Sequence, residues 1–216
     1  MWDDIFKRVS YRPASLTYYA NVLGLKEVRR GVEVDFNVKP TEWITVNGMF
    51  SAGAWFYDSD VDATFIDDAT NQIVGEGKLL IKDLKVGDAA QLTWALGADV
   101  KATENLKFDA TYRYADNLYS GFDPGNNYNK NTPAVKLPSF GLLDLGLTLS
   151  TKTNVGKSLS FRLNVNNVLD ETYISDMRTN TAADANEANN WNGLNKKNQV
   201  YFGFGRTWNA SISYKF

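Results

Sequence analysis

The chain has 216 residues, a formal net charge of −2, and neither cysteine nor histidine. These absences exclude disulfides, thiolate and imidazole metal sites, and catalysis by Ser-His-Asp or Cys-His groups. No apolar run approaches the roughly 18 residues of a membrane helix, but a barrel in which alternate residues face lipid stays open.

Alternating apolar and polar residues run through most of the chain and predict an all-β fold of antiparallel, up-and-down strands. In residues 31–39, Val32 and Val34 face one way while Glu33 and Asp35 face the other. About eight such stretches follow one another, as in a transmembrane β-barrel. The predicted strands cover residues 1–9, 31–39, 43–57, 90–102, 106–118, 139–150, 158–168 and 199–216.

Short turns alternate with long connections between these strands. The predicted turns are 39–42, 103–105 and 151–157, and the predicted loops are 10–27, 58–89, 120–138 and 169–198. Outer-membrane barrels have this layout, with short periplasmic turns and long extracellular loops. We therefore expect the last three loops to be extracellular and to be the most mobile parts of the chain.

Charged side chains gather on the polar face of nearly every strand, whereas the apolar faces carry only Arg206. A water-filled lumen accommodates this pattern, but a dry sandwich core does not. We expect the apolar residues to face lipid and the charged ones to face the lumen. The outward set is Leu92, Trp94, Phe108, Tyr112, Leu145, Leu147, Phe161, Leu163, Phe202 and Phe204, and the lumen set is Asp99, Lys107, Arg113, Asp144 and Arg162.

The hairpin around residues 103–105 offers a choice of strand register. Opposed like charges destabilise a strand pair, while opposite charges contribute about 0.2–1 kcal/mol. We therefore predict that Asp99 lies opposite Lys107, or else that Lys101 lies opposite Asp109. The first arrangement needs the tighter turn and is preferred, although turn geometry competes with these small energies.

The last stretch, QVYFGFGRTWNASISYKF, alternates from Gln199 to Phe216 and ends on an aromatic residue. It resembles the closing strand of TonB-dependent outer-membrane receptors. The matching residues are Gly203 or Gly205, Arg206, Thr207 and Phe216. The terminal aromatic also resembles the signal read by the barrel-assembly machinery, which the resemblance implies as a partner through Phe216.

The segment LNVNNVLDETY resembles a second element of these receptors, which lies one loop before the closing strand. The matching residues are Val165, Asn167, Leu169, Asp170 and Tyr173. GVEVDFNVKPTEWITVNGMFS resembles a receptor hairpin, so the resemblance covers essentially the whole chain. Asn167 and Asp170 can bond nearby backbone groups as the strand ends, and Tyr173 can lie at the headgroup level or cap the barrel mouth. We expect structural roles for the motif.

The resemblance implies a Gram-negative outer-membrane location and active uptake of a bulky nutrient, such as a metal chelate, cobalamin or a glycan. Such receptors have about 22 strands around an amino-terminal plug that engages TonB, whereas this sequence shows about eight strands and no plug. Residues 1–216 are therefore expected to be the carboxy-terminal part of a larger barrel. Met1 is followed by no signal peptide, which favours a fragment. The implied partners are outer-membrane lipid, TonB through the missing plug, and a surface lipoprotein.

Two alternatives remain open at this point. The first is a stand-alone outer-membrane barrel of about eight strands with an adhesion or structural role. The second is a soluble β-sandwich binding module, which would sediment as a soluble protein without detergent. The gene sequence upstream of Met1 separates the first alternative from a receptor, because a receptor requires a plug and a TonB box there.

Aromatic residues in or beside the long loops are candidate ligand contacts, because they can stack on sugar or chelate rings. These are Tyr119, Phe122, Tyr128, Tyr173 and Trp191. Interfacial anchoring or loop packing is the competing explanation, and it is the more general use of such residues.

Acidic residues suggest two further chemistries, and neither is favoured. The series Asp58, Asp60 and Asp62 has calcium-like spacing, but Ala63 and Ala69 occupy the places where an EF-hand loop needs Gly and Glu. Asp99 and Asp109 resemble a glycosidase pair, but nearby Lys101, Lys107 and Arg113 favour lumen salt bridges that keep both carboxylates ionised. We predict no catalytic residues, no metal, no cofactor and no nucleic-acid partner.

Overall fold

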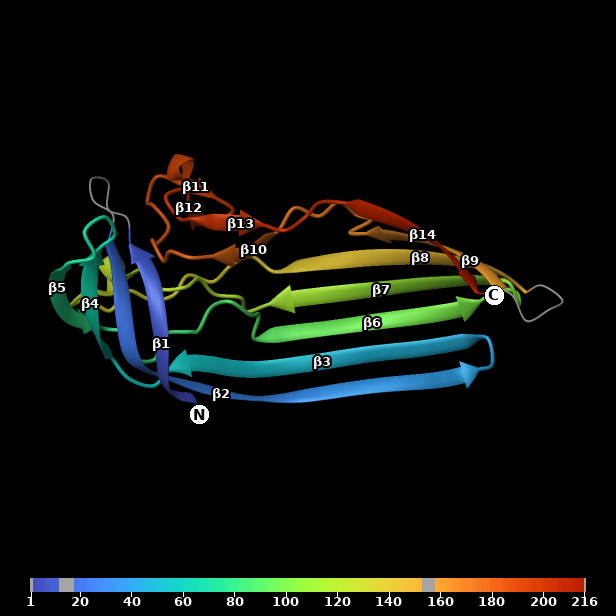
Figure 1. The fold of residues 1–216 in the computed structure, drawn as a ribbon, viewed down its shortest axis with the longest axis horizontal. Helices are drawn as coiled ribbons and strands as arrows, with labels where there is room; N and C mark the ends of the chain where they lie inside the picture. Colours follow the sequence, from blue (N-terminus) through green and yellow to red (C-terminus); the bar gives the residue numbers. More distant parts are fainter. Residues whose placement is uncertain (1, 12–17, 153–157, 216) are drawn as a thin grey trace.

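A computed structural model describes residues 2–11, 18–152 and 158–215, and it is built almost entirely from antiparallel strands (Figure 1). The strands are β1 (Trp2–Tyr11), β2 (Tyr18–Thr41), β3 (Ile44–Tyr57), β4 (Val61–Asp67), β5 (Ile73–Leu79), β6 (Leu92–Lys101), β7 (Leu106–Asp116), β8 (Phe140–Lys152), β9 (Ser158–Asn166), β10 (Ile174–Met177), β11 (Asn190–Trp191), β12 (Leu194–Asn195), β13 (Val200–Phe202) and β14 (Thr207–Lys215). The helices are a single turn, α1 (Pro124–Asn127), and a 3-10 turn, η1 (Glu187–Asn189). No helix among the described residues is long and apolar enough to cross a membrane.

Strands β2, β3, β6, β7, β8, β9 and β14 form an up-and-down meander in which each strand pairs with its neighbour in sequence. The β2–β3 and β6–β7 turns and the last residues of β14 lie at one end of the sheet, which we call the turn end (Figure 1). The opposite end carries three long connections, namely loop 1 (58–91), loop 2 (117–139) and loop 3 (167–206), and we call it the loop end. The predicted all-β, up-and-down architecture is confirmed.

The strand register gives the meander one polar and one apolar face. Asp99, Lys107 and Arg113 share the polar face with Asp144 and Arg162. The apolar residues of the outward set that lie in β6 to β9 share the opposite face. The predicted division of these residues between two faces is therefore confirmed for β6 to β9. That the apolar face meets lipid and the polar face meets a lumen remains a prediction. The extension of β2 adds another cation to the apolar face, since Arg30 shares that face with Val32 and its guanidinium lies 5.6 Å from the centre of the Phe56 ring.

The register of the β6–β7 hairpin differs from both predicted arrangements. Asp99 lies opposite Asp109 and Lys101 opposite Lys107, so like charges face each other. The reason lies in the turn, where the Thr103 hydroxyl accepts hydrogen bonds from the amides of Asn105 and Leu106, at 3.2 and 3.1 Å. The hydrogen bonds of this turn outweigh the small repulsion between the opposed like charges.

The loops predicted at 10–27 and 58–89 contain regular strands. Residues 18–30 belong to β2, which pairs with β1 and β4 near the loop end, and β4 pairs with β5. The loop prediction is therefore wrong over 10–11, 18–27, 61–67 and 73–79, and short strands at 174–177, 190–191 and 194–195 contradict it in loop 3 as well. Residues 12–17 lie outside the described part. Figure 1 shows β1, β4 and β5 standing across the loop end of the meander.

The closing stretch is two strands and not one. Val200–Phe202 pairs with β10 inside loop 3, and only Thr207–Lys215 pairs with β9. Between them, the position of Gly203 is covered by the Tyr173 ring, and Gly205 lies beside Asp170. Alternation alone cannot reveal this break, because residues 203–206 keep the same period as the strands on either side.

Candidate functional site at the loop end

The buried core lies at the loop end and not between the strands of the meander. One apolar cluster joins β2 and loop 1 to Phe122 of loop 2, and a second joins Leu118 and Leu137 of loop 2 to Met177 and Leu194 of loop 3. Each cluster thus connects different long connections. The loop end is therefore a packed structure in which segments far apart in the sequence share buried clusters.

Two buried asparagines tie the three long loops together. The Asn180 amide donates to Asn127 Oδ1 at 2.9 Å, and its Oδ1 accepts from the backbone N–H of Asp123 at 3.0 Å. Asn127 in turn donates to the Leu80 carbonyl at 3.1 Å and accepts from the Leu80 amide at 2.9 Å through its own carbonyl. Both asparagines are fully buried. We call this group the asparagine clasp; the burial around it also raises the pKa of the Asp123 carboxyl.

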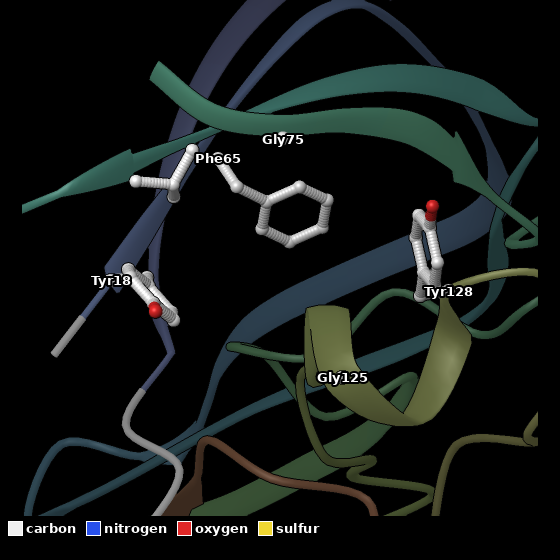
Figure 2. Close-up of a pocket in the computed structure, with 6 residues that line it drawn as sticks. Tyr18, Phe65, Gly75, Gly125 and Tyr128 are labelled. Carbon is white, nitrogen blue, oxygen red and sulfur yellow. The ribbon is translucent and has the colours of Figure 1, made fainter. Parts of the chain in front are cut away.

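An aromatic cavity of about 290 Å³ opens beside the clasp. Figure 2 shows the Tyr18, Phe65 and Tyr128 side chains around it, with Gly75 of β5 on one side and Gly125 of α1 on the other. The lining residues are Tyr18, Phe65, Val74, Gly75, Gly125 and Tyr128. The Phe65 and Tyr128 rings meet edge to face, with centroids 5.6 Å apart.

The five candidate ligand contacts do not converge on one point. Tyr128 lines the aromatic cavity, and Phe122 is buried against Tyr57 with an edge-to-face ring contact at 5.5 Å. Tyr119 is half-buried and forms an isolated bridge to Lys136. The other two lie in loop 3: Tyr173 stacks on Phe140 at 4.2 Å, and Trp191 meets Phe202 edge-on at 5.5 Å.

Tyr18 and Phe65 were not among the five candidates, although both are aromatic residues of stretches predicted as loops, 10–27 and 58–89. Tyr18 begins β2, and Phe65 sits in the middle of β4. The only sequence signal for a strand at this place is the short alternation in the run VDATFID, and it is weak. Nothing in the sequence brings Phe65 to Tyr128.

The Asn167-Val168-Leu169-Asp170 part of the family motif forms the corner where β9 leaves the sheet. Asn167 and Asp170 adopt positive φ, at 50° and 57°. The Asn167 amide donates to the Glu171 carbonyl at 2.9 Å and its Oδ1 accepts from the Glu171 N–H at 2.9 Å. The expected backbone bonding of Asn167 and Asp170 is confirmed. Leu169 is exposed beside them, and Val165 pairs with Trp208.

Asp170 also holds the start of the closing strand. Its Oδ1 accepts from the Arg206 backbone N–H at 2.8 Å, and its Oδ2 lies 3.4 Å from the Arg206 guanidinium. The backbone hydrogen bond from Arg206 lowers the pKa of the Asp170 carboxyl. The remaining motif residue, Phe216, lies outside the described residues.

The polar face carries two ion pairs that cross strands. Arg113 contacts Asp144 at 2.6 Å, and Arg162 contacts Asp109 at 2.9 Å, reaching from β9 to β7. Asp144 also accepts the Asn167 N–H at 2.9 Å, which connects the ion pairs to the motif corner. Asp109 is therefore engaged by a cation, but the cation is Arg162 and not Lys101, Lys107 or Arg113 as expected. Asp99 accepts from the Asn47 amide at 3.5 Å.

The aspartates of loop 1 bond backbone groups. Asp60 accepts from the amides of Ile81 and Lys82, both at 2.9 Å, and Asp67 accepts from the Thr70 amide at 2.8 Å. Within the described ranges there is no group of three or more acidic or histidine side chains that could hold a metal ion. These carboxylates act as turn caps in the structure.

Comparisons with known proteins give a family. Two crystal structures of the ferric-catecholate import receptor Fiu from Escherichia coli K12 match: the closed form at 14% identity and a TM-score of 0.44, and the open form at 13% and 0.41. The matches cover 92% and 95% of this chain but only 28% and 30% of the receptor, so the chain spans less than a third of its length. A search of curated proteins gave no match. The model of the family described as TonB dependent receptor-like, beta-barrel matches residues 3–168, which is most of the chain, and the chain therefore belongs to that family.

Proposed function

We propose that the chain forms the carboxy-terminal part of the barrel of a TonB-dependent outer-membrane transporter that takes up a bulky nutrient, such as a metal chelate, cobalamin or a glycan. The observation that carries the proposal is the division of the meander into a polar, ion-paired face and an apolar face below a packed loop end. Such a wall suits a water-filled passage through lipid.

The loop end is the part that would meet the nutrient. It presents aromatic side chains on packed loops, which lowers the entropy that a ligand must remove on binding. Tyr128 and the aromatic cavity support a contact directly, while Tyr119, Tyr173 and Trp191 are proposed as secondary contacts. Phe122 is buried and is proposed to support the packing of the loops without touching the ligand.

The partners follow from the same arrangement. Lipid covers the apolar face, where Val32, Trp208 and Ile212 are 63%, 73% and 74% exposed. The barrel-assembly machinery of a Gram-negative cell recognises the chain through its closing strand β14. TonB acts through a plug that belongs to the rest of the barrel, and a surface lipoprotein covers the loop end.

The described sheet bears on the alternative of a small stand-alone barrel. Among the described residues, β14 pairs only with β9, and residues 28–41 of β2 pair only with β3. A closed barrel leaves no such edges. The larger barrel is therefore the function that the geometry supports better.

Energy-dependent uptake tests the proposal. The complete reading frame is expressed in a Gram-negative host lacking its own uptake systems, and accumulation of radiolabelled metal chelates, cobalamin and oligosaccharides is measured with and without TonB. We expect saturable uptake of one nutrient class that disappears when TonB is deleted. Uptake that is unchanged by the TonB deletion, or no uptake of any class, overturns the proposal.

A further inference from the structure

We propose that the aromatic cavity binds one uncharged ring of the transported molecule, either an aromatic ring or a sugar ring. The proposal rests on the proposed function, because a loop-end site is useful only if that end meets the nutrient. It concerns a cavity made by β2, the β4–β5 hairpin and α1, away from the polar face of the meander.

The chemistry of the lining selects the ligand. The cavity is lined by three aromatic rings, one valine and two glycines, and this set contains no Asp, Glu, Lys or Arg. Aromatic faces pack against other rings and against the apolar face of a sugar, while the Tyr18 and Tyr128 hydroxyls can hydrogen-bond its polar groups. A charged group would lose its water here without gaining an opposite charge from the lining.

The cavity is held in shape by backbone pairing. Tyr128 bridges Leu79 at the edge of β5, and the Asn129 amide donates to the Lys78 carbonyl at 3.1 Å. The Tyr128 ring lies where a side chain at Gly77 would stand, so only glycine at that place admits the ring. Tyr128 is therefore fixed before a ligand arrives, and little side-chain entropy is lost on binding.

The size of the cavity limits what it takes. Pockets that enclose whole small ligands measure about 300–1,000 Å³, and this cavity, at about 290 Å³, holds one ring of a larger molecule. Gly75 lines it, and a Cβ built on Gly75 meets no atom within 4 Å. A larger side chain at Gly75 would therefore occupy the space meant for the ring without displacing other groups.

Fluorine NMR of the full chain in detergent micelles tests the proposal. The tyrosines are replaced by fluorotyrosine, and the Tyr128 resonance is identified as the one missing from Tyr128→Phe. The protein is titrated with benzyl alcohol, as an aromatic ring, and with methyl β-glucoside, as a sugar ring. We expect at least one probe to shift the Tyr128 resonance saturably.

Three variants locate the binding. Gly75→Leu, which fills the cavity, and Gly77→Ala, which displaces the Tyr128 ring, are each expected to weaken the binding at least tenfold. Ile73→Ala is the matched control, because Ile73 lies in the same strand, is 64% exposed and does not line the cavity. It should change the affinity less than twofold.

The outcomes separate the two ligand sources and the two proposals. Saturation by one probe alone assigns the ring as aromatic or as sugar. No saturable shift at Tyr128 with either probe, or equal affinities in Gly75→Leu, Gly77→Ala and the native chain, overturns the ring site. TonB-dependent uptake that persists after that result leaves the transporter proposal standing. Ring binding without TonB-dependent uptake removes the transporter proposal and, with it, the claim that the ring belongs to a transported molecule, while the cavity remains a ring-binding site.

Discussion

At the scale of single residues, several glycines leave room for a side chain of a neighbouring strand. Gly146 lies directly opposite Asp109, whose carboxylate occupies the space of the missing Cβ and so reaches Arg162 on the next strand. Aromatic or polar side chains that cover a strand glycine restore packing lost with the missing side chain. Asn47 covers Gly97 and Tyr112 covers Gly141 in the same way, while Tyr173 covers Gly203 and Tyr128 covers Gly77 from outside the strands.

Replacing Gly146 should break the ion pair between Asp109 and Arg162. In Gly146→Ala the new Cβ falls on the Asp109 carboxylate, which must leave Arg162. We expect a loss of about 1–3 kcal/mol in the free energy of unfolding, measured by urea titration in lipid vesicles. Gly75→Ala, where a Cβ meets no atom within 4 Å, is the control and should lie within about 0.5 kcal/mol of the native chain. In Asp109→Ala the carboxylate is absent, so Gly146→Ala should cost little when it is added to that variant. If the losses of the two single variants simply add in the double variant, this account is contradicted.

The Asp170–Arg206 link should depend on pH. The backbone N–H of Arg206 holds the pKa of Asp170 below its ordinary value of 3.8. The stabilisation is therefore present above the ordinary value and is lost as the pH falls through the lowered one. Hydrogen exchange of the Arg206 amide, corrected for its intrinsic pH dependence, should accelerate in that range. Asp170→Asn should abolish the pH dependence, and an unchanged profile in this variant would refute the assignment.

At the scale of elements, strict alternation predicted the strands of the meander but not the loop end. β3, β6, β7, β8 and β9 lie close to their predicted ranges, because each buries neither face and keeps a clean two-residue period. Loop 1 was misjudged because its strands pack apolar residues such as Val61, Ala63 and Leu79 on a core shared with distant segments. Among the cavity residues only Tyr128 was identified from the sequence. Tyr18 and Phe65 reach the cavity through the pairing of β2 with β4, which is non-local and therefore not visible in the sequence.

The register of the β6–β7 hairpin can be exploited to stabilise the sheet. Lys101 faces Lys107 across the pair, so Lys107→Glu creates an opposite pair at that place. We expect a gain of about 0.2–1 kcal/mol in unfolding free energy, because opposed charges of opposite sign attract. The double variant Lys101→Glu with Lys107→Glu restores like charges and serves as the control. A gain in the double variant as large as in the single one would show that the two positions are not opposed.

The asparagine clasp should control the loop end without affecting the meander. Asn180→Ala leaves the Asn127 side-chain oxygen and the Asp123 N–H without their partner, and an unsatisfied buried group costs about 1–3 kcal/mol. Hydrogen exchange should accelerate in loops 1, 2 and 3 together and stay unchanged in β6 to β9. Asn186→Ala, which removes an exposed local cap, should affect only η1. Acceleration confined to loop 3 would mean that Asn180 does not couple the loops.

At the scale of the whole molecule, the core and the wall are separate. The buried apolar clusters lie at the loop end, while both faces of the meander remain accessible along its length. In a soluble sandwich the apolar faces of the strands would be buried against each other. Here Phe36, Leu96 and Phe108 are 45%, 51% and 46% exposed, and an exposed apolar face of this extent supports the proposed contact with lipid.

The facing of the wall is the prediction that distinguishes a membrane barrel from other all-β folds. Leu147 and Thr148 are neighbours in β8, and the register places Leu147 on the apolar face and Thr148 on the polar face with Arg162. Spin labels at the two positions are compared in lipid vesicles. The label at Leu147 should relax faster with oxygen, which concentrates in lipid, and the label at Thr148 with a water-soluble nickel complex, because only that face meets water. The pair Leu163 and Asn164 in β9 repeats the comparison on the next strand. Equal access of the nickel complex to both members of each pair would rule out a lipid-facing wall, and with it the transporter.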